Sequence, residues 1–148
     1  MQIITIPGAP LPLGHYSPAI VHHGLVYVSG QLPIDPFTGE HVQGDIEAQT
    51  ERVLENLRLI LESANSSLQQ VLQVTIYTAD MSLWQRINVV YARVFGDHRP
   101  ARAVVPTCPL HYGLLIELSA IAATSSAALP DGDGRTSGST GITEVSHD

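Results

Sequence analysis

Residues 114–122 constrain the fold of this chain more than any other stretch of its sequence. Successive side chains of an extended strand point to opposite faces of the sheet. One face of this strand would carry only apolar residues, namely Leu114, Ile116, Leu118, Ala120 and Ala122. The other face would carry Leu115, Ser119, Ile121 and one charged residue, Glu117. Because both faces are largely apolar, each needs a layer packed against it.

Two helical segments are available to form such a layer. Apolar residues recur at helical spacing in residues 46–64, where Asp45 suits the N-cap and Asn65 suits the left-handed position beyond the end. A second helix is predicted for about residues 82–95, with Gly96 as its stop. Two helices cover one face of a sheet and leave the other open. We therefore expect further copies of the same chain to cover the open face.

Six strand-like segments surround these helices, at residues 2–5, 17–21, 25–29, 71–78, 101–105 and 114–122. In the fourth of them, Leu72, Val74 and Ile76 would share one face. The order β-β-β-α-β-α-β-β predicts an α+β fold, in which a mixed sheet carries both helices on one face. Residues 1–124 would form a single domain. Residues 125–148 contain few large apolar groups, so we predict a polar, flexible C-terminal tail there.

Charge and residue usage exclude several classes of function. With 14 acidic and 7 basic residues, and a formal net charge of -7, the chain lacks the basic surface that nucleic acid or an anionic membrane would need. All basic residues are arginine, which excludes a lysine Schiff base, a pyridoxal phosphate anchor and a Walker-type lysine. The single cysteine, Cys108, forms neither an intrachain disulfide nor a multi-cysteine metal site. No signal peptide or spanning segment is recognisable, so we expect a soluble, cytoplasmic protein.

Arg102 and Glu117 each lie inside an otherwise apolar, strand-like run. A charged group in such a run is costly to desolvate unless it has a partner. The two residues could pair with each other for structure, or they could face a cleft and bind a substrate. The residues alone favour the structural ion pair.

Several short motifs, in this order and spacing, resemble the RidA/YjgF family of reactive-intermediate deaminases over about the first 123 residues. The matching stretches are Tyr16-Ser17, Val28-Ser29-Gly30-Gln31-Leu32-Pro33, Asp35-Pro36, Thr38-Gly39-Glu40, Asn56-Leu57, Asn88 with Tyr91, Pro100-Ala101-Arg102, Ile116-Glu117-Leu118 and Ala120-Ile121-Ala122. The resemblance implies a chorismate-mutase-like fold of the bacillus type. It also implies a homotrimer with clefts between subunits that hold small carboxylate-bearing substrates.

The resemblance further implies hydrolysis of 2-imino acids, which arise from enamines such as 2-aminoacrylate, to 2-keto acids and ammonia without metal or cofactor. Arg102 would hold the substrate carboxylate, and Glu117 would position and activate the attacking water. Tyr16 would line the cleft, and Gly30 would offer a backbone N–H without a side chain in the way. Asn88 would contribute from the second helix, and backbone groups at Val104 would contact substrate or water.

The chain departs from the family pattern at several positions near these residues. Val104 stands where many members have a cysteine, His15 and His111 replace prolines, and Ser119 replaces a second acid. Chemistry that depends on a thiol at that position is therefore not transferred to this chain. The changes leave two alternatives open: a pathway-specific enzyme with a larger substrate, and a non-catalytic trimer that binds small carboxylates.

The histidines have different expected roles. His15 and His111 flank site segments, and either could carry a proton, although a structural role is the more common outcome. His22 and His23 form the only adjacent pair, in a predicted turn, and spacing supplies no third metal ligand. His98 is expected at the surface. Cys108 is expected to be a small, partly buried residue rather than a nucleophile.

Overall fold

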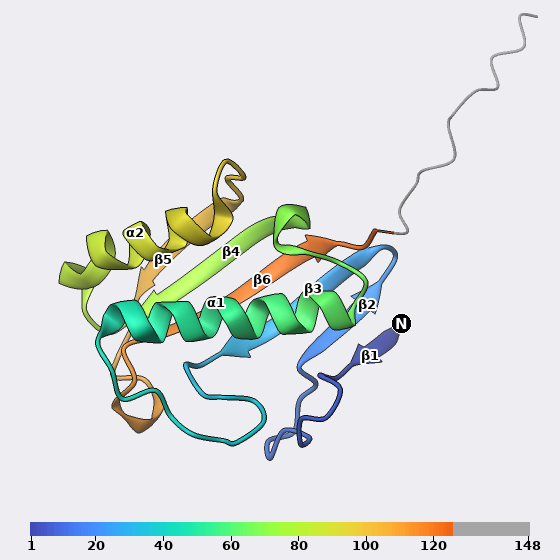
Figure 1. Ribbon diagram of the computed structural model, residues 1–148, viewed down its shortest axis with the longest axis horizontal. Coiled ribbons are helices and arrows are strands. Elements are labelled where there is room, and N and C mark those ends of the chain that lie inside the picture. Colours follow the sequence, from blue (N-terminus) through green and yellow to red (C-terminus); the bar gives the residue numbers. More distant parts are fainter. Residues whose placement is uncertain (126–148) are drawn as a thin grey trace, which may run out of the picture.

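The computed structural model describes residues 1–125 as a six-stranded mixed sheet with two α-helices (Figure 1). The sheet order is β1-β2-β3-β6-β4-β5. Only β4 and β5 are parallel, and every other neighbouring pair is antiparallel. The strand bounds are β1 Gln2–Ile4, β2 Ala19–His22, β3 Leu25–Gln31, β4 Val71–Thr78, β5 Ala101–Pro106 and β6 Ile116–Ala123.

Both helices lie on the same face of the sheet, as the sequence predicts (Figure 1). α1 (Ile46–Ser63) packs on β3 and β6, and α2 (Trp84–Phe95) packs beside α1 along the β4–β5 side. Three short 3-10 turns complete the fold: η1 Leu68–Gln70, η2 Met81–Leu83 and η3 His111–Gly113. The predicted α+β class and the order of elements are confirmed.

The ends of the helices follow the predicted local chemistry. The Asp45 carboxylate accepts a hydrogen bond from the Ala48 N–H at 3.0 Å, which satisfies one of the free donors of the first turn of α1. Asn65 takes a left-handed φ of 54° just after that helix. Gly96 ends α2 with a φ of 60°. These residues fix the lengths of the two covering helices.

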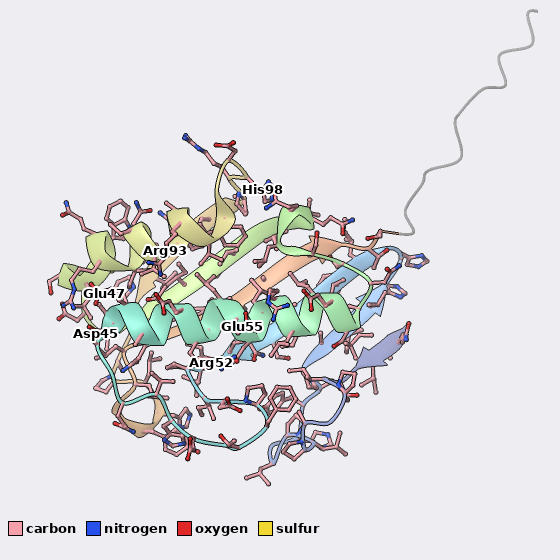
Figure 2. The ribbon with its side chains drawn as sticks, in the orientation of Figure 1. Asp45, Glu47, Arg52, Glu55, Arg93 and His98 are labelled. Carbon is pink, nitrogen blue, oxygen red and sulfur yellow. The ribbon has the colours of Figure 1, made fainter. Side chains whose placement is uncertain are left out.

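Ion pairs on the solvent side join the two helices. Arg86 of α2 pairs with Glu47 of α1 at 2.6 Å. Arg93, about two turns further along α2, pairs with Glu51, about one turn further along α1. Figure 2 shows Glu47 near the start of α1 and Arg93 on the side of α2 that faces α1. Exposed ion pairs of this kind each contribute little free energy, so burial of the apolar faces must provide most of the free energy that holds the two helices on the sheet.

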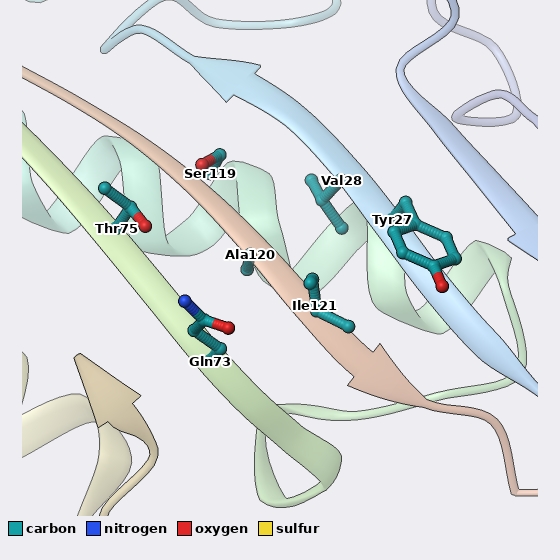
Figure 3. Close-up of a pocket in the computed structure, with 7 residues that line it drawn as sticks. All are labelled: Tyr27, Val28, Gln73, Thr75, Ser119, Ala120 and Ile121. Carbon is teal, nitrogen blue, oxygen red and sulfur yellow. The ribbon is translucent and has the colours of Figure 1, made fainter. Parts of the chain in front are cut away.

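The core lies between the helices and one face of the sheet. Ile116, Leu118, Ala120 and Ala122 of β6 are buried there, while the alternate residues of the strand are only half-buried. The uncovered face of the sheet is the one that Figure 3 shows. Its hollow lies between β3, β6 and β4 and is bordered by Tyr27, Gln73, Thr75, Ser119 and Ile121. The chain therefore has one face packed by helices and one face open.

One prediction about β4 is wrong. Leu72 was expected on the same face as Val74 and Ile76, but the register of β4 against β6 shifts between Val71 and Gln73. The extra residue of this bulge is Leu72, which is 49% exposed, whereas Val71 is 0% exposed. The bulge thus moves Val71, rather than Leu72, into the core.

The last described residue, Ser125, lies at the predicted boundary between the domain and the C-terminal tail. The Ser125 N–H donates to the Asn65 carbonyl at 2.8 Å, which holds the chain against the end of α1 at the last described position. The rest of the predicted tail lies outside the described residues. Among residues 1–125, no helix is long and apolar enough to cross a membrane.

The burial pattern predicts very different costs for two leucine truncations. Leu118→Ala should lower the free energy of unfolding by about 2–5 kcal/mol, because it leaves a cavity between β6 and the helices. Leu72→Ala is the matched control, and its effect should stay within about 0.5 kcal/mol, because the side chain lies outside the core. Urea denaturation measures both values. Equal losses would contradict the position of the bulge.

Candidate functional site

Glu117 lies on the open face of the sheet, near the start of β6. Its neighbours Ile116 and Leu118 point into the core, while Glu117 lies opposite Tyr77 of β4 and is half-buried. Within residues 1–125, its carboxylate forms no ion pair or hydrogen bond. A half-buried carboxylate without a partner is a candidate for contact with a ligand or water.

Gly30 lies directly against the carboxylate of Glu117. The register of β3 against β6 shifts between Val28 and Gln31, which is a bulge opposite Ser119. A Cβ atom at Gly30 would overlap the Glu117 Oε1 atom. Only glycine therefore allows β3 and the Glu117 carboxylate to approach so closely. This is a steric reason for a glycine at position 30.

Glu117 borders a hollow, called the Glu117 hollow below. Tyr16, Gly30 and His111 also border it, together with an apolar wall made by Leu13, Leu32, Ile34 and Tyr112. The structure thus brings three residues of the predicted set, Tyr16, Gly30 and Glu117, to one place. Sequence reasoning identified only Leu32 of this apolar wall, as part of a matching family stretch, because the wall residues come from segments without a periodic apolar pattern.

Hydrogen bonds to Ser29 fix the segment that carries Tyr16. The Ser29 hydroxyl donates to the Ser17 carbonyl at 2.6 Å, and the Ser29 N–H donates to the Pro18 carbonyl at 3.0 Å. Because Ser29 precedes Gly30, these two bonds tie the Tyr16 segment to the bulge. Tyr16 itself stays exposed at the edge of the hollow.

The loop after β3 is held by two side chains of α1. The buried Asn56 amide donates to the carbonyls of Leu32 and Ile34 at 3.1 and 2.8 Å. Arg52 donates to the Asn56 oxygen at 3.0 Å and pairs with Asp35 at 3.4 Å. Backbone N–H groups, chiefly, and the Arg52 charge lower the pKa of Asp35. This network fixes the position of Leu32 and Ile34 in the hollow wall.

Two buried polar side chains hold the backbone just before Glu117. The Leu115 N–H donates to the Gln49 side-chain oxygen at 2.8 Å, and the Thr78 hydroxyl donates to the Leu115 carbonyl at 2.9 Å. Both side chains are buried, so water does not compete for these bonds. Sequence reasoning missed Gln49 and Thr78. A polar residue on the apolar face of α1 was the available signal for Gln49.

Arg102 borders a different hollow, the Arg102 hollow, together with Asn88 and Tyr91. Its register opposite the buried Val74 places it on the helix-covered face of the sheet, at the edge strand β5. Its guanidinium carbon lies 4.6 Å from the ring centre of Tyr91 and 5.8 Å from that of Trp84. Within residues 1–125, the Arg102 guanidinium forms no ion pair and donates no hydrogen bond.

The structural ion pair between Arg102 and Glu117 is therefore not formed in this chain. The two residues belong to opposite faces of the sheet, because Arg102 aligns with Val74 and Glu117 with Tyr77, and these two residues of β4 point to opposite sides. Val104 borders neither hollow, and its side chain packs against the core beside Ile76. Each chain thus carries two separate parts of the predicted site.

The other candidate residues have clear positions. His98 is half-buried rather than at the surface, and its Nε2 atom lies 2.7 Å from the Val71 carbonyl (Figure 2). Cys108 is exposed, contrary to the expectation of partial burial. His15 is exposed, and His111 borders the Glu117 hollow. In the described part of the chain, no group of three or more His, Cys, Asp or Glu residues could hold a metal ion.

Comparison with known proteins agrees with this fold. The family model described as Endoribonuclease L-PSP matches residues 7–124. The chain therefore belongs to the L-PSP family, which is the RidA/YjgF family.

The matches with individual relatives cover nearly the whole length of those proteins. The chain is 47% identical to a RutC family protein of Pyrococcus horikoshii over 121 residues, which are 82% of this chain and 96% of that protein. It resembles the crystal structure of a candidate endoribonuclease from Thermotoga maritima, with a TM-score of 0.79, 50% identity, and coverage of 84% and 98% of the two chains. It also resembles the crystal structure of Escherichia coli TdcF with bound serine, with a TM-score of 0.78, 31% identity, and coverage of 84% and 100%.

The loop network predicts the effect of removing the Asn56 amide. Asn56→Ala should lower the free energy of unfolding by about 1–3 kcal/mol, because it leaves the Leu32 and Ile34 carbonyls without their donor. Gln69→Ala, at an exposed position of η1, is the control and should change it by less than about 0.5 kcal/mol. Urea denaturation gives both values. A neutral Asn56→Ala would show that the loop holds its position without this amide.

Proposed function

We propose that the protein is a cofactor-independent hydrolase of the cytoplasm that converts small 2-imino acids to 2-keto acids and ammonia. Membership of the RidA/YjgF family supports a deaminase-type role on small molecules in general. The observation that carries the proposal is the state of its two charged residues. Arg102 and Glu117 are each partly buried and each border a hollow, and neither side chain forms an ion pair or a hydrogen bond within residues 1–125.

A complete site would then combine the two hollows of neighbouring chains in a homotrimer. One chain cannot bring Arg102 and Glu117 to the same substrate, because they lie on opposite faces of its sheet. Glu117 lies on the open face of the sheet, which no helix covers. Packing a second copy there would cover this face and bring a second Arg102 hollow towards it.

The proposed chemistry begins with the carboxylate of the substrate. A planar guanidinium binds a carboxylate through two parallel N–H donors, and Arg102 has its donors free within the described chain. The relative TdcF, whose crystal structure contains serine, holds a small molecule with a carboxylate of this kind. Asn88, which borders the same hollow, would add a polar contact.

Glu117 would then act as the base for water. Its carboxylate accepts a proton from a water molecule as the water oxygen bonds to the carbon of the protonated imine, whose nitrogen becomes an amine. Glu117 gives this proton to the amine nitrogen and then takes the proton of the new hydroxyl group as the C–N bond breaks, so that ammonia leaves and the carbonyl of the keto acid forms. Ammonia takes this last proton and leaves as ammonium, which returns Glu117 to its carboxylate form. Tyr16 and the Gly30 backbone border the place of this step. An imine is already electrophilic, so water is the only co-substrate that the step needs.

Val104 would take part in this mechanism only through its backbone. Its side chain packs against the core beside Ile76 and faces neither hollow. The cysteine that many family members have at this position would, in this chain, have no counterpart, because Cys108 lies beyond β5.

The two central residues provide the first test. Arg102→Ala and Glu117→Gln should each lower the release of ammonia and keto acid from freshly generated 2-aminoacrylate by at least about 10²-fold. Arg93→Ala is the matched control, since Arg93 pairs with Glu51 on the outer surface and borders neither hollow. Size-exclusion chromatography should show that all variants keep the same oligomer. Unchanged turnover in Arg102→Ala would contradict the proposal, and tight keto-acid binding without turnover would favour a non-catalytic trimer.

The apolar wall of the Glu117 hollow favours a second candidate, an enzyme for a larger substrate. Leu13, Leu32, Ile34 and Tyr112 would surround a substrate side chain with apolar groups. In a panel of 2-imino acids, kcat/KM should then rise from the two-carbon side chain to branched and aromatic ones, by roughly tenfold per one or two buried methylenes. Rates that fall with size would favour the small-substrate hydrolase.

A further inference from the structure

We propose that Trp84 and Tyr91 are positioning residues that hold the Arg102 guanidinium ready for a carboxylate. This inference rests on the proposed function, because it takes Arg102 as the group that binds the substrate anion. It gives a role to Trp84, which lies outside the family motifs, and to Tyr91, which belongs to one of them without an assigned role in the reaction; neither residue borders the Glu117 hollow.

Helical geometry places both rings beside Arg102. Trp84 lies in the first turn of α2 and Tyr91 lies about two turns further along, so both point to the same side of the helix. Asn88 lies between them on this side and borders the same hollow. The Arg102 guanidinium carbon is 4.6 Å from the Tyr91 ring centre and 5.8 Å from the Trp84 ring centre. Both distances are within the range of a cation–π interaction.

The rings hold the cation without neutralising it. A carboxylate at this place would pair with the guanidinium and occupy its N–H donors, whereas an aromatic face attracts the charge through its quadrupole and leaves those donors available. Within residues 1–125, the Arg102 guanidinium donates no hydrogen bond. An arginine held in this way is fixed in position and still able to form two parallel bonds to an incoming carboxylate.

The Tyr91 hydroxyl does not compete for the charge. It is buried and has no hydrogen-bond partner within the described chain. Burial raises the pKa of Tyr91 to about 12, although the Arg102 charge opposes this shift. The phenol therefore stays neutral at the pH of any ordinary assay, and Arg102 has no phenolate beside it.

Trp84 and Tyr91 differ in burial, and therefore in how much each side chain contributes to the stability of the fold. Tyr91 is 7% exposed and packs on Phe95 with ring centres 4.5 Å apart, so its loss would also lower stability. Trp84 is 38% exposed, and its replacement should cost little stability. Trp84→Leu thus tests the positioning role even if Tyr91→Leu folds poorly. Tyr91→Phe keeps the ring and removes only the hydroxyl.

The test measures binding of 2-oxobutanoate by calorimetry, and turnover of 2-iminobutanoate separately. Trp84→Leu and Tyr91→Leu should each weaken binding by about 3- to 30-fold. KM should rise by a similar factor with a much smaller change in kcat, because Glu117 and its water are untouched. Tyr91→Phe should restore affinity towards that of the unmodified chain. In the unmodified chain, 2-oxobutanoate should also change the fluorescence of Trp84, the single tryptophan, and this change should be lost in Arg102→Ala.

The outcomes separate this inference from the proposed function. If both leucine variants bind 2-oxobutanoate as tightly as the unmodified chain, while Arg102→Ala does not bind it, the rings only fill space and the inference is wrong, with the hydrolase proposal intact. If binding follows the predicted pattern but no 2-imino acid is hydrolysed, the inference holds and the hydrolase proposal fails. An unmodified chain that does not bind 2-oxobutanoate overturns the inference as well.

Discussion

The two unlike faces of β6 determine the rest of this structure. Its apolar face, with Ile116 and Leu118, is buried under α1 and contributes a large part of the core. The next side chain along, Glu117, must therefore point to the opposite face, which no helix of the described chain covers. A strand that supports a core on one side is rigid, so the acid on the other side is held in place by the same packing.

Buried polar side chains extend this rigidity to the loops. Gln49 and Thr78 hold the backbone of Leu115, and Asn56 holds the loop that follows β3. All three side chains are buried, so each hydrogen bond forms without competition from water, and its loss would leave an unpaired group in the interior. The loops around Glu117 carry no regular structure, yet they are tied to helices and strands at several points. A site built in this way needs little rearrangement to receive a ligand.

Much of the fold was predictable, because apolar spacing and capping residues act locally. The helix at residues 46–64 and the strand at residues 71–78 follow directly from periodicity, and Asp45, Asn65 and Gly96 mark ends as expected. The positions that failed depend on pairing between distant strands. Leu72 lies in a bulge, which reverses the alternation around it. His98 was expected at the surface, but its ring bonds a carbonyl of β4.

The same limit applies to the site. The sequence identifies Arg102 and Glu117 as candidate site residues, because a charge in an apolar run is costly to bury. It does not show that they lie on opposite faces of the sheet, since this depends on the register of β5 and β6 against β4. Val104 was grouped with them from the family resemblance through its backbone groups alone, and its side chain packs against the core. Motifs identify candidate site residues, whereas the alternation of side chains along each strand and the register between strands decide which of them lie on the same face.

The separation of Arg102 and Glu117 has a consequence for symmetry in the proposed assembly. A contact that brings the Arg102 hollow of one copy to the Glu117 face of the next joins two different surfaces, so it is heterologous rather than self-complementary. Heterologous contacts close into a ring only if the rotation between copies divides a full turn. In a closed ring every copy gives one hollow and receives another, so no half-site is left over. An open chain of copies would always carry one unmatched charge at each end.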